Sequence, residues 1–212
     1  MKRFKKIVIG NIVGTVALSA LLFGADIAGD YLSVSKDGQG YRMPISFKKN
    51  GKVTLMGMDA GTWKESSDGK TVSISSVFDN GKSKTYTIKS QSSDMLVLKI
   101  DENEIKYHKI DKTKLLENNK QAPVIGDWTI KTANVTETFS FSLPDNLKYV
   151  KEDKSQGTTD TAEGNWYYDK QKKQLLIAIM KGGMTGESNI KTVSANKMTL
   201  LYQGKSINLV KK

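Results

Sequence analysis

Apolar and polar residues alternate through most of this chain. Tyr41, Met43, Ile45 and Phe47 are separated by single polar or small residues, which is the period-two pattern of a half-buried β-strand. Residues 50–51 (Asn-Gly) follow, and this dipeptide accepts the positive φ angles of a tight hairpin turn. Similar short segments, separated by glycine-containing turns, continue to the end of the chain. The pattern therefore predicts antiparallel strands joined by tight turns.

The same landmarks occur twice along the chain, about 100 residues apart, and such spacing indicates an internal repeat. The second copy contains an additional polar stretch, residues 152–163, for which we expect a longer loop. The paired motifs are Gly29-Asp30-Tyr31 with Gly126-Asp127-Trp128, Gly61-Thr62-Trp63 with Gly164-Asn165-Trp166, and Ile88-Lys89 with Ile190-Lys191.

The repeat predicts how the chain is divided. We expect a first barrel of eight strands over residues 29–110 and a second over residues 126–212, because closure into a barrel removes exposed strand edges. Residues 111–125 are polar, lack β-alternation and contain a proline, so we expect a linker with one helical turn. The predicted fold is all-β: two tandem eight-stranded antiparallel meander barrels behind an N-terminal signal or anchor helix.

Residues 1–25 have the parts of a secretory signal peptide. Residues 1–6 are basic, residues 7–23 are mainly apolar, and small residues follow, as in exported proteins. The apolar run is at the short limit for a spanning helix, so a retained anchor that contacts the membrane through residues 7–23 is the alternative. Both interpretations place the body of the protein outside the cytoplasm: periplasmic, secreted or associated with the envelope.

Charge and cysteine content exclude several classes of function. The net charge is +11, but the lysines are interspersed with acidic residues, whereas nucleic-acid binders cluster Lys and Arg on one face. We therefore expect no nucleic-acid partner. The chain has no cysteine, which excludes disulfides and thiol catalysis, so an exported form depends on its core alone.

The residues that could support catalysis or metal binding are few. His108 is the only histidine; a Ser-His-Asp site would have to use it, and ligation of haem is the alternative to a surface position. The acidic turns 79–81 and 101–104 lack the spacing of a calcium loop, and residues 181–186 lack the ending of a phosphate loop. An envelope hydrolase would need His108 or an acid pair from 152–163. We expect no enzyme, metal or cofactor.

A Gly-x-Trp motif at the start of an eight-stranded meander resembles the lipocalin and calycin group, especially the short lipocalin-like domains of bacterial envelope proteins. Residues 126–128 (Gly-Asp-Trp) carry the motif, and residues 29–31 (Gly-Asp-Tyr) carry a variant with Tyr for Trp. The resemblance implies that Trp128 and Tyr31 pack across one end of each barrel. It also implies a late basic residue on that aromatic ring, whose position the sequence leaves open.

The expected function is that of an exported, non-enzymatic binding protein with a small apolar ligand in a barrel mouth. The alternative is a structural or partner-binding envelope module whose barrels are filled solid by side chains. An apolar cavity of several hundred Å³ would favour the ligand, and an exposed aromatic patch would favour an envelope protein partner. The candidate ligand contacts are Tyr41, Met43, Phe47, Trp63, Phe139, Phe141 and Trp166.

Overall fold

The computed structural model describes residues 26–34, 43–182 and 184–212. The helix expected within residues 1–25 and the candidate contact Tyr41 lie outside the described residues. Within the described ranges, no helix is both long enough and apolar enough to cross a membrane.

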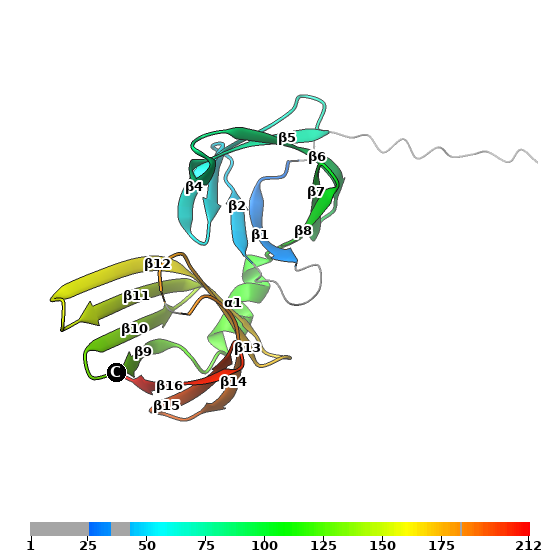
Figure 1. The fold of residues 1–212 in the computed structure, drawn as a ribbon. Coiled ribbons are helices and arrows are strands. Elements are labelled where there is room, and N and C mark those ends of the chain that lie inside the picture. Colours follow the sequence, from blue (N-terminus) through cyan, green and yellow to red (C-terminus); the bar gives the residue numbers. More distant parts are fainter. Residues whose placement is uncertain (1–25, 35–42, 183) are drawn as a thin grey trace, which may run out of the picture.

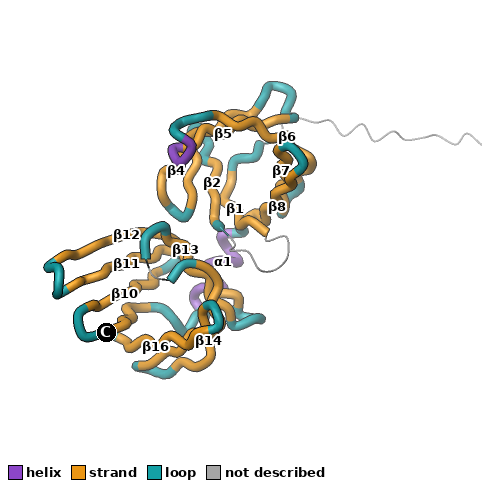
Figure 2. The backbone as a smooth tube through the Cα atoms, in the orientation of Figure 1, coloured by secondary structure: helices purple, strands orange, loops and turns teal. Residues whose placement is uncertain are grey.

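The chain forms two closed antiparallel barrels, each of eight strands, with one α-helix between them (Figure 1). In each barrel every strand pairs with its neighbours in sequence, and the last strand pairs with the first. The predicted all-β fold with two eight-stranded antiparallel barrels is confirmed. Figure 2 shows how completely strands and turns account for both barrels.

We call the first eight strands barrel 1. Its elements are β1 (Gly29–Val34), β2 (Pro44–Phe47), β3 (Lys52–Leu55), β4 (Met58–Glu65), β5 (Thr71–Ser76), the 3-10 helix η1 (Val77–Asp79), β6 (Ser83–Gln91), β7 (Met95–Ile100) and β8 (Asn103–Lys109).

We call the second set barrel 2, and the helix α1 (Lys112–Lys120) precedes it. Its strands are β9 (Gly126–Lys131), β10 (Val135–Ser142), β11 (Asn146–Asp153), β12 (Thr158–Asp169), β13 (Gln174–Ile179), β14 (Gly186–Val193), β15 (Lys197–Tyr202) and β16 (Lys205–Lys211).

The first strand of each barrel holds its aromatic ring in the same way. The Tyr31 hydroxyl donates to the carbonyl oxygen of Ile27 at 3.0 Å, and Trp128 Nε1 donates to that of Val124 at 2.7 Å. Lys211 Nζ lies 5.5 Å from the centroid of the Trp128 ring. Lys211 therefore occupies the position of the late basic residue that the sequence could not locate.

Glycine two positions before each paired tryptophan lets neighbouring strands approach closely. A Cβ atom on Gly61 would overlap the carbonyl oxygen of Ser75, and one on Gly164 would overlap that of Ala178. Glycine in a strand commonly marks such a close backbone approach. The repeated Gly-x-Trp motifs therefore have the same steric cause in both barrels.

Two segments differ from the expectation. Residues 112–120 form a helix of nine residues rather than one turn. Its composition is mainly polar, so the sequence lacks the apolar stripe by which an amphipathic helix is predicted. Residues 152–163 are mostly strand, because β11 and β12 extend as a hairpin closed by a turn before Thr158. The threonines of 158–161 favour extended backbone, and a loop was the wrong prediction there.

Candidate functional site

Side chains fill the interior of barrel 2. Phe139, Phe141 and Trp166 are at most 2% exposed, and the centroids of the Phe141 and Trp166 rings are 5.7 Å apart with the rings nearly perpendicular. Phe139 lies 5.1 Å from the Tyr149 ring. Trp166 Nε1 donates to the carbonyl oxygen of Ser142 at 2.9 Å. These aromatic rings pack on one another as a core does.

Aromatic side chains also pack on one another inside barrel 1, but they are less completely buried. Phe47 is buried, and its ring centroid lies 5.7 Å from that of Trp63. Trp63 is only partly buried, and its Nε1 donates to the carbonyl oxygen of Lys48 at 2.9 Å. Met43 is 39% exposed. A ligand contact for any of these residues, or for Phe139, Phe141 and Trp166, stays a prediction.

A hollow of about 430 Å³ on barrel 2 is lined mainly by charged residues. They are Glu137, Lys151, Asp160 and Lys181, together with Tyr149 and Gly182. The Tyr149 hydroxyl donates to Glu137 Oε1 at 2.6 Å.

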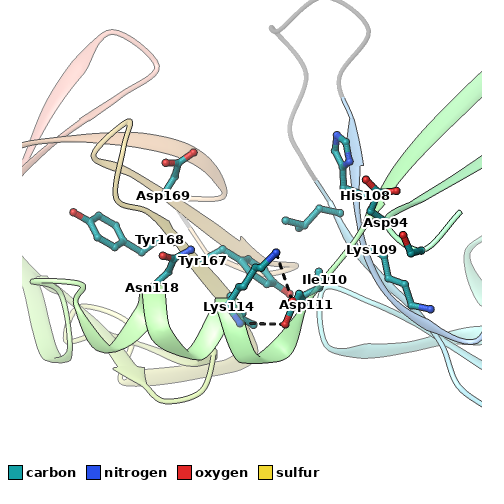
Figure 3. Close-up of a pocket in the computed structure, with 13 residues that line it drawn as sticks. Asp94, His108, Lys109, Ile110, Asp111, Lys114, Asn118, Tyr167, Tyr168 and Asp169 are labelled. Atoms are coloured by element: carbon teal, nitrogen blue, oxygen red, sulfur yellow. Dashed lines mark hydrogen bonds and ion pairs between the residues drawn. The ribbon is translucent and has the colours of Figure 1, made fainter.

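A larger cavity, of about 680 Å³, lies between the two barrels beside α1. We call it the inter-barrel cleft. Figure 3 shows Asp94 and His108 on the barrel 1 side, Tyr168 and Asp169 on the barrel 2 side, and Lys114 on the helix between them. Apolar contacts come from Leu32, Ile110, Leu115 and Tyr167. Three separate parts of the chain therefore build one cavity.

The helix α1 begins at an N-cap that faces the cleft. The Asp111 carboxylate accepts hydrogen bonds from the backbone N–H groups of Thr113 at 2.9 Å and Lys114 at 3.1 Å, as N-cap side chains do. Lys114 Nζ lies 3.8 Å from Asp111 Oδ2. The charge of Lys114 is therefore partly compensated within the helix.

Asn119 fixes α1 to barrel 2. Its fully buried side-chain amide donates to the carbonyl oxygens of Pro144 at 2.6 Å and Trp166 at 3.4 Å. Its side-chain oxygen accepts from the N–H group of Tyr168 at 3.1 Å. A shift of the helix would leave these buried groups unpaired, at a cost of about 1–3 kcal/mol for each group.

An ion pair fixes α1 to barrel 1. Lys112 Nζ lies 2.7 Å from Asp30 Oδ2, and Lys48 Nζ lies 3.1 Å from Asp30 Oδ1. Burial alone would raise the pKa of Asp30, but hydrogen bonds from Lys112, Ser46 and Lys48 outweigh it and lower the pKa to about 2. Asp30 is therefore ionised throughout the physiological range.

A smaller hollow of about 290 Å³ lies beside this ion pair, and Asp145, Asn165 and Tyr167 of barrel 2 line its other side. Burial raises the pKa of Asp145, against the attraction of Lys112. The Tyr167 side chain hydrogen-bonds Asp145, and burial raises the pKa of Tyr167. Asn165 Nδ2 donates to Asp145 Oδ2 at 3.1 Å. Lys112 thus lies near one carboxylate from each barrel, and this holds the cleft walls in place.

The carboxylates on the two cleft walls have separate local partners. Asp94 Oδ1 accepts from the Ser92 hydroxyl at 2.6 Å, and this hydrogen bond lowers the pKa of Asp94. Asp169 Oδ1 accepts from the N–H group of Lys172 at 3.1 Å. Within the described ranges, no three His, Cys, Asp or Glu side chains come together as a metal site would need. His108 lies on the cleft wall and not inside barrel 1.

Sequence reasoning missed the cleft because its residues are far apart along the chain. Tyr167 directly follows the inward-facing Trp166, so alternation places it on the outer face of the barrel, where the structure leaves it only 8% exposed. A buried aromatic residue on the outside of a barrel has to be covered by another element. Here that element is the region around α1 and Asp145.

The fold and the cleft define a protein of two tandem lipocalin-like barrels, each a closed eight-stranded meander with a Gly-x-aromatic motif on its first strand. No family model matches the sequence. No curated protein matches it either.

Two solved structures were compared with the chain. A lipocalin-like protein from Bacteroides thetaiotaomicron VPI-5482 aligns over 42% of this chain and 100% of its own, with 24% identity and a TM-score of 0.33. The β chain of DNA polymerase III from Streptococcus pneumoniae TIGR4 aligns over 86% of this chain and 56% of its own, with 10% identity and a TM-score of 0.13. The lipocalin-like resemblance rests on the barrels themselves, and neither alignment extends to function.

Proposed function

We propose that this chain is an exported, non-enzymatic binding protein that holds a small amphipathic amine in the inter-barrel cleft. The observation that carries the proposal is the cleft itself: about 680 Å³, lined from both barrels and from α1. Ligand cavities in proteins typically measure about 300–1,000 Å³. The barrel interiors, in contrast, are occupied by their own aromatic side chains.

The proposed class of ligand rests on the apolar residues and carboxylates of the lining, which also contains Lys109 and Lys114. Leu32, Ile110 and Leu115 offer an apolar surface, and the Tyr167 ring adds to it. Asp94 and Asp169 place a carboxylate on each wall, and the lowered pKa of Asp94 keeps its carboxylate charged at neutral pH. A molecule with an apolar body and an ammonium group matches both features, because charged donors bind carboxylates more strongly than neutral donors do.

Export is supported by the sequence alone. The basic, apolar and small-residue segments of residues 1–25 follow the order of a signal peptide. The proposed location is the periplasm, the envelope or the exterior of the cell.

Native mass spectrometry of the protein purified from its own envelope tests the proposal. A co-purifying amine of low mass is expected, and a clean mass of the protein alone would contradict a small ligand. We then expect Asp94→Asn to weaken binding of that molecule about fivefold to tenfold, the loss of one charged contact. Asp101→Asn is the matched control, because Asp101 is an exposed carboxylate of barrel 1 outside the cleft lining.

A second candidate function is a partner-binding envelope module with solid barrels. The filled interiors favour it, and so does an exposed apolar pair on η1, where Val77 is 58% and Phe78 is 51% exposed. Such pairs are suited to protein contacts. Chemical cross-linking in the intact envelope would give a product of defined mass that Phe78→Ser abolishes, whereas a product unaffected by the substitution would count against this surface.

A further inference from the structure

The hairpin of β11 and β12 leaves part of one strand with a neighbour on one side only. β12 has 12 residues and pairs with β11 from Thr158 to Asn165. Its pairing with β13 covers only Gly164–Asp169. Residues 158–163 therefore form a strand edge that projects beyond barrel 2, as Figure 1 shows.

The backbone groups at this edge have a definite direction. Trp166 N–H donates to the carbonyl oxygen of Asp145 at 3.0 Å, on the β11 side. Since N–H and C=O groups alternate sides along a strand, those of Thr159, Thr161 and Glu163 point away from β11. Among the described residues no strand pairs with them. All three residues are exposed.

Barrel 1 covers the corresponding region of its own sheet. After β5 ends at Ser76, the chain continues into η1, which packs beside β4. Natural proteins usually protect free strand edges with such coverage, with lysine or with proline. Residues 158–163 (Thr-Thr-Asp-Thr-Ala-Glu) contain neither lysine nor proline, and only the carboxylates of Asp160 and Glu163 oppose pairing at this edge.

We propose that the β12 edge pairs antiparallel with the β12 edge of a second copy of this chain. A two-fold axis through Thr161 places Thr161 opposite Thr161 and Thr159 opposite Glu163, all with backbone groups facing the partner. Asp160 then lies opposite Ala162. The arrangement forms about six backbone hydrogen bonds and is isologous, as in most homodimers.

Charge favours this register over one of the two neighbouring registers. In this register no two like charges lie directly opposite each other. A shift that centres the axis on Asp160 would place two carboxylates face to face, which destabilises a strand pair. The edge is thus complementary to itself, and threonine pairs suit cross-strand contacts.

Sedimentation velocity of the protein from its own envelope, over a range of concentrations, tests the proposal with two opposite substitutions. The wild-type protein is expected to approach twice its monomer mass as the concentration rises. Thr161→Lys and Thr161→Glu should each stay at the monomer mass, because like charges meet at the axis. An equal mixture of the two variants should associate again, because Lys then faces Glu.

Thr62→Lys is the matched control. Thr62 is an exposed strand threonine that has neighbours on both sides, Lys52 and Ser75, so this variant should associate as the wild type does. A wild-type protein that stays monomeric would overturn the proposal, as would variants that associate alone or a mixture that does not. Association through any other part of the chain would not depend on the sign of the charge at residue 161.

Discussion

The two barrels make the same contacts around paired tryptophans but bury them to different depths. Trp63 Nε1 and Trp166 Nε1 each donate to a backbone carbonyl oxygen at 2.9 Å. Trp166 is completely buried, whereas Trp63 is only partly so. Among the residues that the structure describes, the core of barrel 2 contains 15 buried residues and that of barrel 1 contains eight. Since buried apolar area drives stability, barrel 2 should be the more stable half.

The difference shows that a repeated Gly-x-Trp motif fixes the position of the tryptophan ring but not how deeply the ring is buried. In barrel 2 the strand β13 is buried on both faces, and Ala122 and Val124, which precede β9, add to the core. In barrel 1 the described residues before the first strand are 26–28, of which Ile27 belongs to the core. Four groups of substitutions, taken from the largest expected effect to the smallest, examine this comparison.

Replacement of the paired tryptophans should affect the barrels unequally. Trp166→Ala should lower the free energy of unfolding by about 3–5 kcal/mol, as for large core residues. Trp63→Ala should cost roughly half as much, because less of its surface is removed from water. Denaturant unfolding followed by circular dichroism measures both. Equal losses would contradict the unequal burial.

Alanine at the paired glycines should be costly in both barrels, and somewhat more so at Gly61, whose φ of +140° side chains rarely adopt. Gly61→Ala and Gly164→Ala each place a Cβ atom against a carbonyl oxygen of the neighbouring strand, so each should cost about 2–3 kcal/mol through displaced backbone. Gly157→Ala is the control, because nothing lies within 4 Å of a Cβ atom there. Its cost should be only about 1 kcal/mol, from the positive φ angle. Thermal unfolding gives the ranking, and a Gly157 variant as damaging as the other two would refute it.

Asp30→Asn should weaken barrel 1 and its attachment to α1 in a pH-dependent way. The pKa of Asp30 is about 2 in the folded protein, against 3.8 for an unperturbed aspartate. Its contribution to stability is therefore present above pH 3.8 and lost as the pH falls through about 2. We expect a loss of about 1–2 kcal/mol at pH 7 and almost none near pH 2, by denaturant unfolding.

The matched control for this prediction is Asp127→Asn. Asp127 holds the equivalent position in barrel 2 but is exposed, and exposed charges contribute about 0–1 kcal/mol. A loss at Asp30 that does not depend on pH, or one that Asp127→Asn reproduces, would show that the pairing with Lys112 is not the cause.

Replacement of Lys109 and Lys211, which lie on the last strand of each barrel, should have the smallest effect on stability. Lys211→Met deletes the ammonium group over Trp128, a contact type that contributes about 0.5–1 kcal/mol at exposed sites. Lys109→Met should cost less, because the aromatic residue of barrel 1 is Tyr31 and tryptophan attracts cations best. Differential scanning calorimetry measures both shifts. A larger loss at Lys109 would reverse this part of the comparison.

The sequence was sufficient to predict the barrels because the alternation of apolar and polar residues within each strand is a local pattern. Alternation placed Phe47, Phe139 and Phe141 on inward faces, and all three are buried. Alternation does not indicate whether inward rings surround a lumen or fill it, because this depends on how rings from distant strands meet. The interleaved contacts of Phe139, Phe141 and Tyr149 could not be derived from one strand at a time.

The cleft could not be predicted for a related reason. Its walls come from both barrels and from α1, and the charged groups beside it, Asp30 of β1, Lys112 of α1 and Asp145 of the turn before β11, are far apart in the sequence. The N-cap of α1 was the one local signal, since Asp111 precedes the helix as such residues commonly do. The polar composition of the helix concealed its length, and no sequence pattern indicated which outer faces it covers.

A crystal structure of the protein purified from its own envelope tests the central claim most directly. The account predicts density for a small molecule in the inter-barrel cleft, in contact with Leu115 and Tyr167, and aromatic cores in both barrels packed as described. Density for a small molecule inside a barrel, against Phe139 or Trp166, would contradict it.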